Sequence, residues 1–83
     1  MIKREVYIIA SDKYVVKLDG IYKRIYLHEE NPNLKISTHY KIGTAKALLT
    51  SVKKDKQIYI DYDNITSEEF DNLEVRKVVE SYE

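Results

Sequence analysis

This 83-residue chain has many charged side chains, but cysteine is absent and histidine, the most versatile catalytic and metal-binding residue, occurs only twice. There is no cysteine, which excludes disulfides and thiolate metal sites and removes any need for an oxidising compartment. The two histidines, His28 and His39, do not have the HExxH spacing of a zinc enzyme, and no pattern of carboxylates completes a site around them. We therefore expect imidazoles at the surface or bonded to backbone carbonyls, with no metal and no cofactor.

The stretch from Asp61 to Asn64 begins like an EF-hand calcium loop. It departs from that pattern at the sixth position, where Thr66 replaces glycine, and at the twelfth, where Asn72 replaces glutamate. The two glycines form no phosphate-binding loop, and no serine has a GxSxG context. We therefore predict that the chain is not an enzyme.

Tyrosine is the unusual residue type, with eight copies and no tryptophan. Tyrosine and arginine are enriched at the energetic centres of interfaces because they combine large area, few rotatable bonds and a polar tip. Regular alternation along the strands would place several of them on one sheet face, with Ile9 and Val15, away from the helix. The predicted contact surface consists of Tyr7, Lys17, Tyr22, Arg24, Tyr26 and Tyr59. The alternative is that these aromatic side chains only stabilise the sheet through cross-strand pairs.

The same face could instead stack nucleic-acid bases. The RNA-recognition consensus is absent, the expected strand order differs from that of such sheets, and a formal net charge of zero weakens a phosphate footprint. Nucleic-acid binding is therefore the second hypothesis, after protein binding.

Charge is distributed unevenly along the chain. Residues 1–54 carry 11 Lys/Arg against 5 Asp/Glu, which is +6, and residues 55–83 carry 3 against 9, which is −6. One interpretation is that the two halves attract each other within one fold. Another is that an acidic array imitates a phosphate backbone and occupies a nucleic-acid channel on another protein. The carboxylates of this second-choice surface are Asp61, Asp63, Glu68, Glu69, Asp71 and Glu74.

A hairpin organises the first third of the chain. Lys13–Leu18 and Ile21–His28 alternate apolar and polar residues around Asp19-Gly20, a dipeptide typical of type I′ hairpin turns. Residues 4–10 are apolar on both faces, as in a central strand. We therefore predict an N-terminal three-stranded antiparallel meander.

One amphipathic helix should cover this sheet. Thr44 is its expected N-cap, and an apolar stripe follows at helical spacing. That stripe consists of Ala45, Leu48, Leu49 and Val52. Residues 34–40 alternate weakly and are a candidate extra strand, and residues 57–62 alternate clearly and predict a strand.

The C-terminal stretch has two interpretations. Thr66 and Glu69 fit a capping box, which predicts a helical turn at 67–72 and then a strand at 74–82. One continuous helix over 67–82 is the alternative, because several apolar residues there share a helical stripe.

Together these elements predict one α+β domain over residues 1–83, with a mainly antiparallel sheet of four to five strands packed on one helix. A chain this short buries roughly 60% of its unfolded surface, so a partner or a second copy pairing at an open sheet edge would add stability. No apolar run suits a membrane span or a signal peptide, so we expect a cytoplasmic protein without membrane contact.

The arrangement KYVVKLDGIYKRIYL, then a short variable piece, then YKIGTAKALL resembles small accessory proteins of phages and mobile elements in low-GC Gram-positive bacteria. The resemblance covers about half the chain, includes no catalytic signature and assigns no residue roles. It implies a host-takeover or anti-defence factor that binds and inhibits a host protein, as inhibitors of CRISPR effectors do. That host protein could itself be one that binds nucleic acid.

Overall fold

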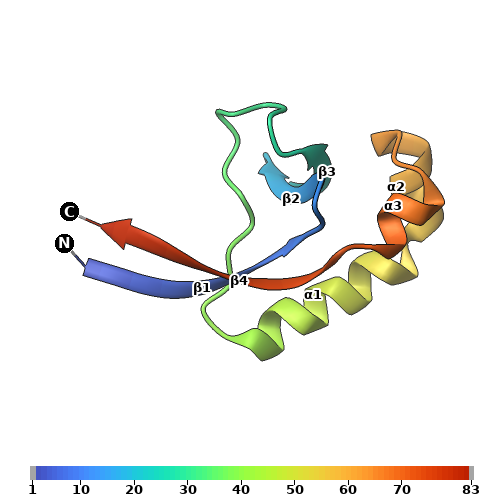
Figure 1. Cartoon of the computed structure of the whole chain (residues 1–83). Helices are drawn as coiled ribbons and strands as arrows, with labels where there is room; N and C mark the ends of the chain where they lie inside the picture. Colours follow the sequence, from blue (N-terminus) through green and yellow to red (C-terminus); the bar gives the residue numbers. More distant parts are fainter. Residues whose placement is uncertain (1, 83) are drawn as a thin grey trace.

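Between residues 2 and 82, the part of the chain that the computed structural model describes, an antiparallel four-stranded sheet packs with three helices (Figure 1). The strands are β1 (Ile2–Ala10), β2 (Tyr14–Asp19), β3 (Tyr22–Leu27) and β4 (Glu74–Tyr82). The helices are α1 (Ile42–Lys54), α2 (Lys56–Asp63) and α3 (Ser67–Asp71). The sheet order is β3-β2-β1-β4. The predicted α+β class and N-terminal meander are confirmed. Besides the predicted amphipathic helix α1 and the predicted helical turn α3, the structure has a third helix, α2, where a strand was expected.

The β2–β3 hairpin has its predicted position, but its turn lies one residue later. Asp19 pairs with Tyr22, so the central residues of the turn are Gly20 and Ile21. Gly20 has a φ of 64°, and Ile21 is not among the residues with positive φ. Positive φ at the first central residue alone is the pattern of a type II′ turn, not type I′. Both turn types match the twist of the flanking strands, which is why the hairpin forms as expected.

The C-terminal stretch is a strand preceded by a short helix. Thr66 Oγ1 accepts a hydrogen bond from the backbone N–H of Glu69 at 3.2 Å and caps α3 as predicted. β4 then pairs with β1 over nine residues. Val75 packs against the main core, whereas Val78 packs on the opposite sheet face. A strand can bury both of these valines on two different faces, which one helical stripe cannot do.

The main core lies between the sheet and the helices. Ala45 and Val52 of the predicted stripe on α1 are buried, and the two leucines of that stripe pack against the core. The helix begins at Ile42 with Lys41 as N-cap, so Thr44 lies in the first turn and does not cap the helix as predicted. The buried residues of the core are Ile9, Val16, Ile25, Val52, Ile65, Phe70 and Leu73. No helix between residues 2 and 82 is long and apolar enough to cross a membrane.

Residues 57–62, predicted as a strand, lie instead within helix α2. The neighbours Tyr59 and Ile60 both pack against the core, which a strand with alternating faces would not allow. The ring centroid of Tyr59 lies 6.2 Å from that of Phe70. Burial against α3 on one helical face has therefore overridden the alternating pattern of the local sequence.

The segment 34–40 fills a gap between β1 and β2. Tyr7 and His39 exchange two backbone hydrogen bonds of 2.7 and 2.9 Å on one side of it. Lys17 and Ile36 form a second isolated bridge on its other side. The weak alternation of these residues therefore corresponds to two bridges and not to a fifth regular strand.

Candidate functional site

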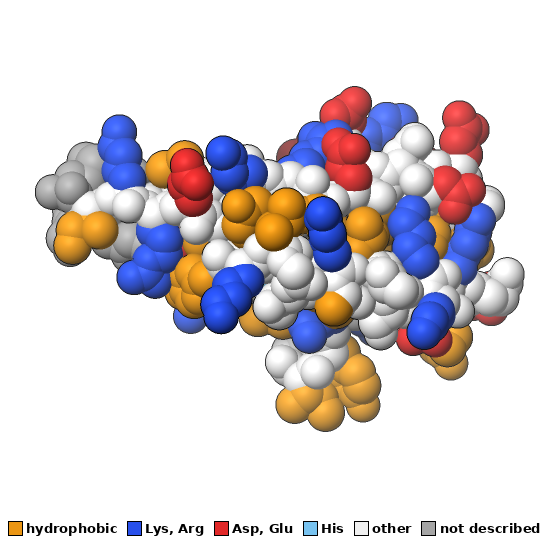
Figure 2. Space-filling model, turned by 90° about the horizontal axis from the view of Figure 1, so that it is seen from below, with side chains coloured by type: hydrophobic (Ala, Val, Ile, Leu, Met, Phe, Trp, Pro, Cys, Tyr) orange, Lys and Arg blue, Asp and Glu red, His pale blue; other side chains and the backbone are white. Residues whose placement is uncertain are grey.

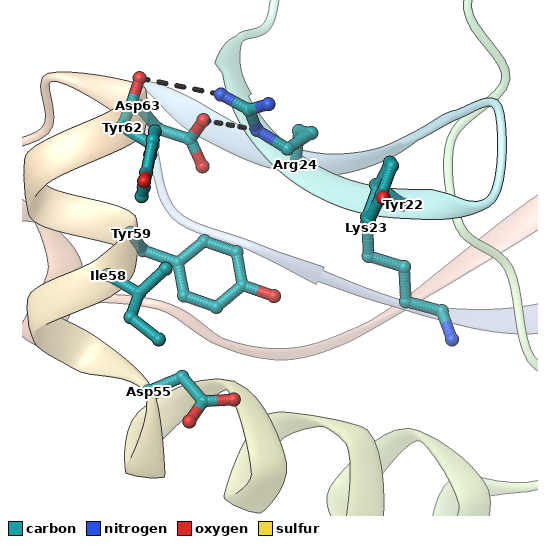
Figure 3. Close-up of a pocket in the computed structure, with 8 residues that line it drawn as sticks. All are labelled: Tyr22, Lys23, Arg24, Asp55, Ile58, Tyr59, Tyr62 and Asp63. Carbon is teal, nitrogen blue, oxygen red and sulfur yellow. Dashed lines mark hydrogen bonds and ion pairs between the residues drawn. The ribbon is translucent and has the colours of Figure 1, made fainter.

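Three of the six predicted contact residues meet at a cleft between β3 and α2 (Figure 3). Tyr22 and Arg24 reach the cleft from β3, and Tyr59 reaches it from α2. The cleft has a volume of about 440 Å³. Its other lining residues are Lys23, Asp55, Ile58, Tyr62 and Asp63.

Asp63 joins the two walls of the cleft. Its carboxylate, only 1% exposed, accepts hydrogen bonds from Arg24 Nε at 2.6 Å and from the backbone N–H of Ile25 at 3.1 Å. β3 is an edge strand, so the carboxylate takes the place of a missing strand partner at this N–H. The hydrogen bond that Arg24 donates to Asp63 is also the largest influence that raises the pKa of Arg24. Asp63 therefore fixes α2 against the edge of the sheet.

Tyr59 forms the floor of the cleft. Burial raises the pKa of its phenol, and the negative charges of Asp55 and Asp63 raise that pKa further. The phenol therefore stays protonated at neutral pH. Figure 3 shows its ring lying across the cleft with the hydroxyl directed toward the β3 wall. From there it can donate a hydrogen bond to a bound group.

Large apolar side chains stand exposed around the cleft. Tyr22, Ile58 and Tyr62 are 65%, 55% and 75% exposed. Among the described residues that line the cleft there is no serine, threonine or histidine. Within residues 2–82 no group of three or more His, Asp or Glu side chains is placed to hold a metal ion. The arrangement offers apolar contact area with a few polar groups, which is the composition of a binding site.

Sequence reasoning missed Ile58 and Tyr62, because residues 57–62 were expected to be a strand. The signal that could have found them is the spacing of Asp55, Ile58, Tyr59 and Tyr62 at i, i+3, i+4 and i+7. That spacing places four side chains on one helical face, and all four line the cleft.

Lys17, predicted as an exposed contact residue, is buried. Its side chain reaches the loop after β3, and the residue is only 3% exposed. The ammonium donates to the carbonyl of Glu30 at 2.6 Å and lies within 3.5 Å of the carbonyl oxygens of His28 and Asn31. Lys17 therefore orders this loop and adds nothing to an exposed surface.

Tyr26, another predicted contact residue, lies opposite Val15 of β2 near the end of β3. Its hydroxyl donates to a carboxylate oxygen of Asp19 at 2.8 Å, and this bond is the largest influence that raises the pKa of Tyr26. The ring is half-buried. Tyr26 therefore holds together the two strands that its hairpin joins, as the alternative of cross-strand stabilisation expected.

The predicted single tyrosine face is not formed. Ala10 pairs with Val15, so these two residues share a face. Ile9 therefore lies on the other face, where it joins the core beneath the helices, and Tyr7 lies on that helix-facing side by alternation. Alternation along one strand shows which of its residues share a face. It does not show which face of the neighbouring strand lies on the same side of the sheet, because that depends on the register between the strands.

Most carboxylates of the second-choice acidic surface form ion pairs with basic side chains, at distances of 2.6 to 3.4 Å. The pairs are Asp63 with Arg24, Glu69 with Lys13, Asp71 with Lys56 and Glu74 with Arg76. The remaining members, Asp61 and Glu68, are exposed. Two of the four pairs join the basic and the acidic half of the chain, which favours the interpretation that the halves attract each other within the fold.

Comparison with known proteins finds no matching family model, no matching curated protein and no matching solved structure.

Proposed function

We propose that this chain is a non-enzymatic protein-binding module that holds its partner at the cleft between β3 and α2. The observation that carries the proposal is the gathering of Tyr22, Ile58 and Tyr62, all more than half exposed, around one cleft. Scattered exposed apolar residues are ordinary, whereas a cluster of them with polar groups beside it is typical of an interaction site. Tyrosine adds binding energy at such sites because its ring loses little conformational freedom.

The cleft suits an apolar side chain of a partner protein. Such a side chain would lie against the ring of Tyr59, between the exposed rings of Tyr22 and Tyr62. Lys23 and Asp55 line the same cleft and would pair with polar groups around that anchor. The ion pair that ties α2 to β3 holds both walls in place before binding, which lowers the entropic cost of association.

The role follows from the resemblance to phage and mobile-element proteins. We propose that the partner is a host protein in the cytoplasm and that binding inhibits or modulates it, in the manner of an anti-defence factor. A target that itself binds nucleic acid would fit this role.

The test is capture from a lysate of a low-GC Gram-positive host with the tagged chain, with and without nuclease, read by mass spectrometry. Tyr62→Ala is the test variant. Tyr40→Ala is its matched control, because Tyr40 is equally an exposed tyrosine but lies outside the cleft. We expect one dominant protein that survives nuclease, binds the control variant and is lost with Tyr62→Ala. Equal capture by both variants would contradict the proposal.

Nucleic-acid binding is the second candidate, supported by a different surface from the one that the sequence predicted. Residues 41–54, which lead into and form α1, contain four lysines and no acidic residue. Figure 2, which views the molecule from the side of α1, shows lysine and arginine side chains spread across this face, with acidic ones mainly along its margins. This candidate predicts that affinity for a single-stranded oligonucleotide falls steeply with salt and weakens in Lys46→Glu. Recovery from the lysate of nucleic acid alone would favour it over protein binding.

A further inference from the structure

The outer edge of β4 is the longest open edge of the sheet. β4 spans nine residues, whereas strands are usually about five or six long, and among residues 2–82 it has β1 as its one neighbouring strand. An open edge presents unpaired N–H and C=O groups that another strand can bind. β4 contains no proline, the residue that would remove a backbone donor from such a pairing.

The β1–β4 pair extends beyond the rest of the fold. Figure 1 shows the two strands running side by side to the end of the molecule where both termini lie, past the first turn of α1 and past the β2–β3 hairpin. The molecule measures 41 Å along this direction of greatest length and 27 and 24 Å across. Ile2 and Val79 on this ribbon are exposed. A two-stranded ribbon by itself is marginally stable in water, so a third strand along it would add stability.

We infer that a second copy of this chain binds at this edge, with the two β4 strands antiparallel across a two-fold axis. An isologous pairing of this kind joins two sheets into one continuous sheet. When α1 of both copies lies on the same face, the axis is perpendicular to the sheet and opposing residues have the same parity in the sequence.

Among the registers that pair most of β4, the charges favour the one centred on Val78, the middle residue of the strand. With Val78 on the axis, Arg76 stands opposite Glu80 of the partner subunit, and symmetry repeats that pair. With Lys77 on the axis, the two lysines face each other and Glu74 opposes Glu80 of the partner subunit, so like charges repel. The strand is therefore self-complementary in the register centred on Val78.

Arg76 can make the additional contact without losing those within its own chain. Its Nε donates to Glu74 at 2.9 Å, and its Nη2 donates to Asp12 at 3.0 Å. A guanidinium has five N–H donors, so Nη1 remains to meet a carboxylate across the edge. The side chain is also partly exposed, as a residue near a new strand must be.

Sedimentation equilibrium of the full chain over a concentration series tests the inference without any other partner. We expect the mass to rise from 9.8 kDa toward twice that value as concentration increases. Arg76→Glu should weaken the dimer about tenfold, because two symmetry-related pairs change from attraction to repulsion. Glu80→Arg should weaken it similarly, and the double variant Arg76→Glu/Glu80→Arg should restore it. Lys77→Glu, which lies on the other face and opposes an uncharged valine in this register, is the control and should leave the association unchanged.

Three outcomes would overturn the inference. One is a mass of 9.8 kDa at every concentration. Another is a dimer that neither single charge reversal weakens, and the third is loss of the dimer in both single variants without recovery in the double variant. Circular dichroism of each variant shows whether it is folded, and either single reversal suffices for the comparison if the other fails to fold.

Discussion

Replacing Asp63 by alanine should release α2 from the edge of β3. The carboxylate is almost fully buried and accepts two hydrogen bonds, one from the Arg24 guanidinium and one from the backbone N–H of Ile25. Its loss leaves that N–H without its partner and removes the countercharge of Arg24. Both changes act where the ion pair of Arg24 and Asp63 joins α2 to β3.

The expected loss of stability in Asp63→Ala depends on how far the side chains of Asp63 and Arg24 are exposed to water. Breaking a fully buried ion pair costs about 3–5 kcal/mol, and leaving a buried N–H unpaired costs about 1–3 kcal/mol. The side chain of Arg24 is 34% exposed, so water partly compensates its lost partner. We therefore expect the free energy of unfolding to fall by about 2–3 kcal/mol, out of about 4–12 kcal/mol for a domain of this size.

Urea unfolding followed by circular dichroism measures this change as a lower midpoint with an unchanged slope. Asp63→Asn should lose less than Asp63→Ala, because the amide oxygen can still accept from Ile25. Asp61→Asn is the matched control: it lies on the same helix, is exposed and accepts only from Gln57 among the bonds described. An Asp63→Ala midpoint equal to that of the control would refute the reasoning.

Two further predictions concern buried or half-buried polar side chains. Lys17→Met keeps the approximate length of the side chain but removes the donor to the Glu30 carbonyl. Amide hydrogen exchange in residues 28–31 should therefore become faster, while the amides of the β1–β4 pair stay protected. Unchanged exchange in residues 28–31 would contradict the role of Lys17. Burial, with a smaller effect from Lys23, lowers the pKa of His39, so the unfolded chain binds this proton more readily than the folded chain. The free energy of unfolding should therefore keep its full value above about pH 6.5 and decline as the pH falls below it. In His39→Gln the urea midpoint should depend less on pH over that range. An equally steep pH dependence in the variant would exclude His39 as the cause.

Local sequence patterns were sufficient for the elements that depend on neighbouring residues. The hairpin around Gly20, the Thr66 cap of α3 and the buried stripe of α1 were all predicted, because turn chemistry, capping and helical spacing act within a few residues. The turn type was predicted wrongly, but the positions of the two strands that it joins were predicted correctly.

The errors concern interactions between distant parts of the chain. Residues of α2 were predicted as a strand because apolar and polar residues alternate there. The stretch is nevertheless helical, with Tyr59 packed against Phe70. Lys17 was placed on the surface because nothing local shows that its ammonium reaches the carbonyl of Glu30. The site was found in part. Its three members from the predicted contact surface were chosen for residue type, whereas Ile58 and Tyr62 required knowledge that this stretch is helical.

The affinity of the purified partner for Tyr62→Ala, measured by isothermal titration beside Tyr40→Ala and the unmodified chain, tests the proposed binding cleft most directly. If the cleft carries the contact, Tyr62→Ala should weaken binding by about 30-fold or more, as removal of an interface tyrosine that contributes about 2 kcal/mol does, while Tyr40→Ala binds as tightly as the unmodified chain. Unchanged affinity in Tyr62→Ala, with the fold intact by circular dichroism, would contradict the account.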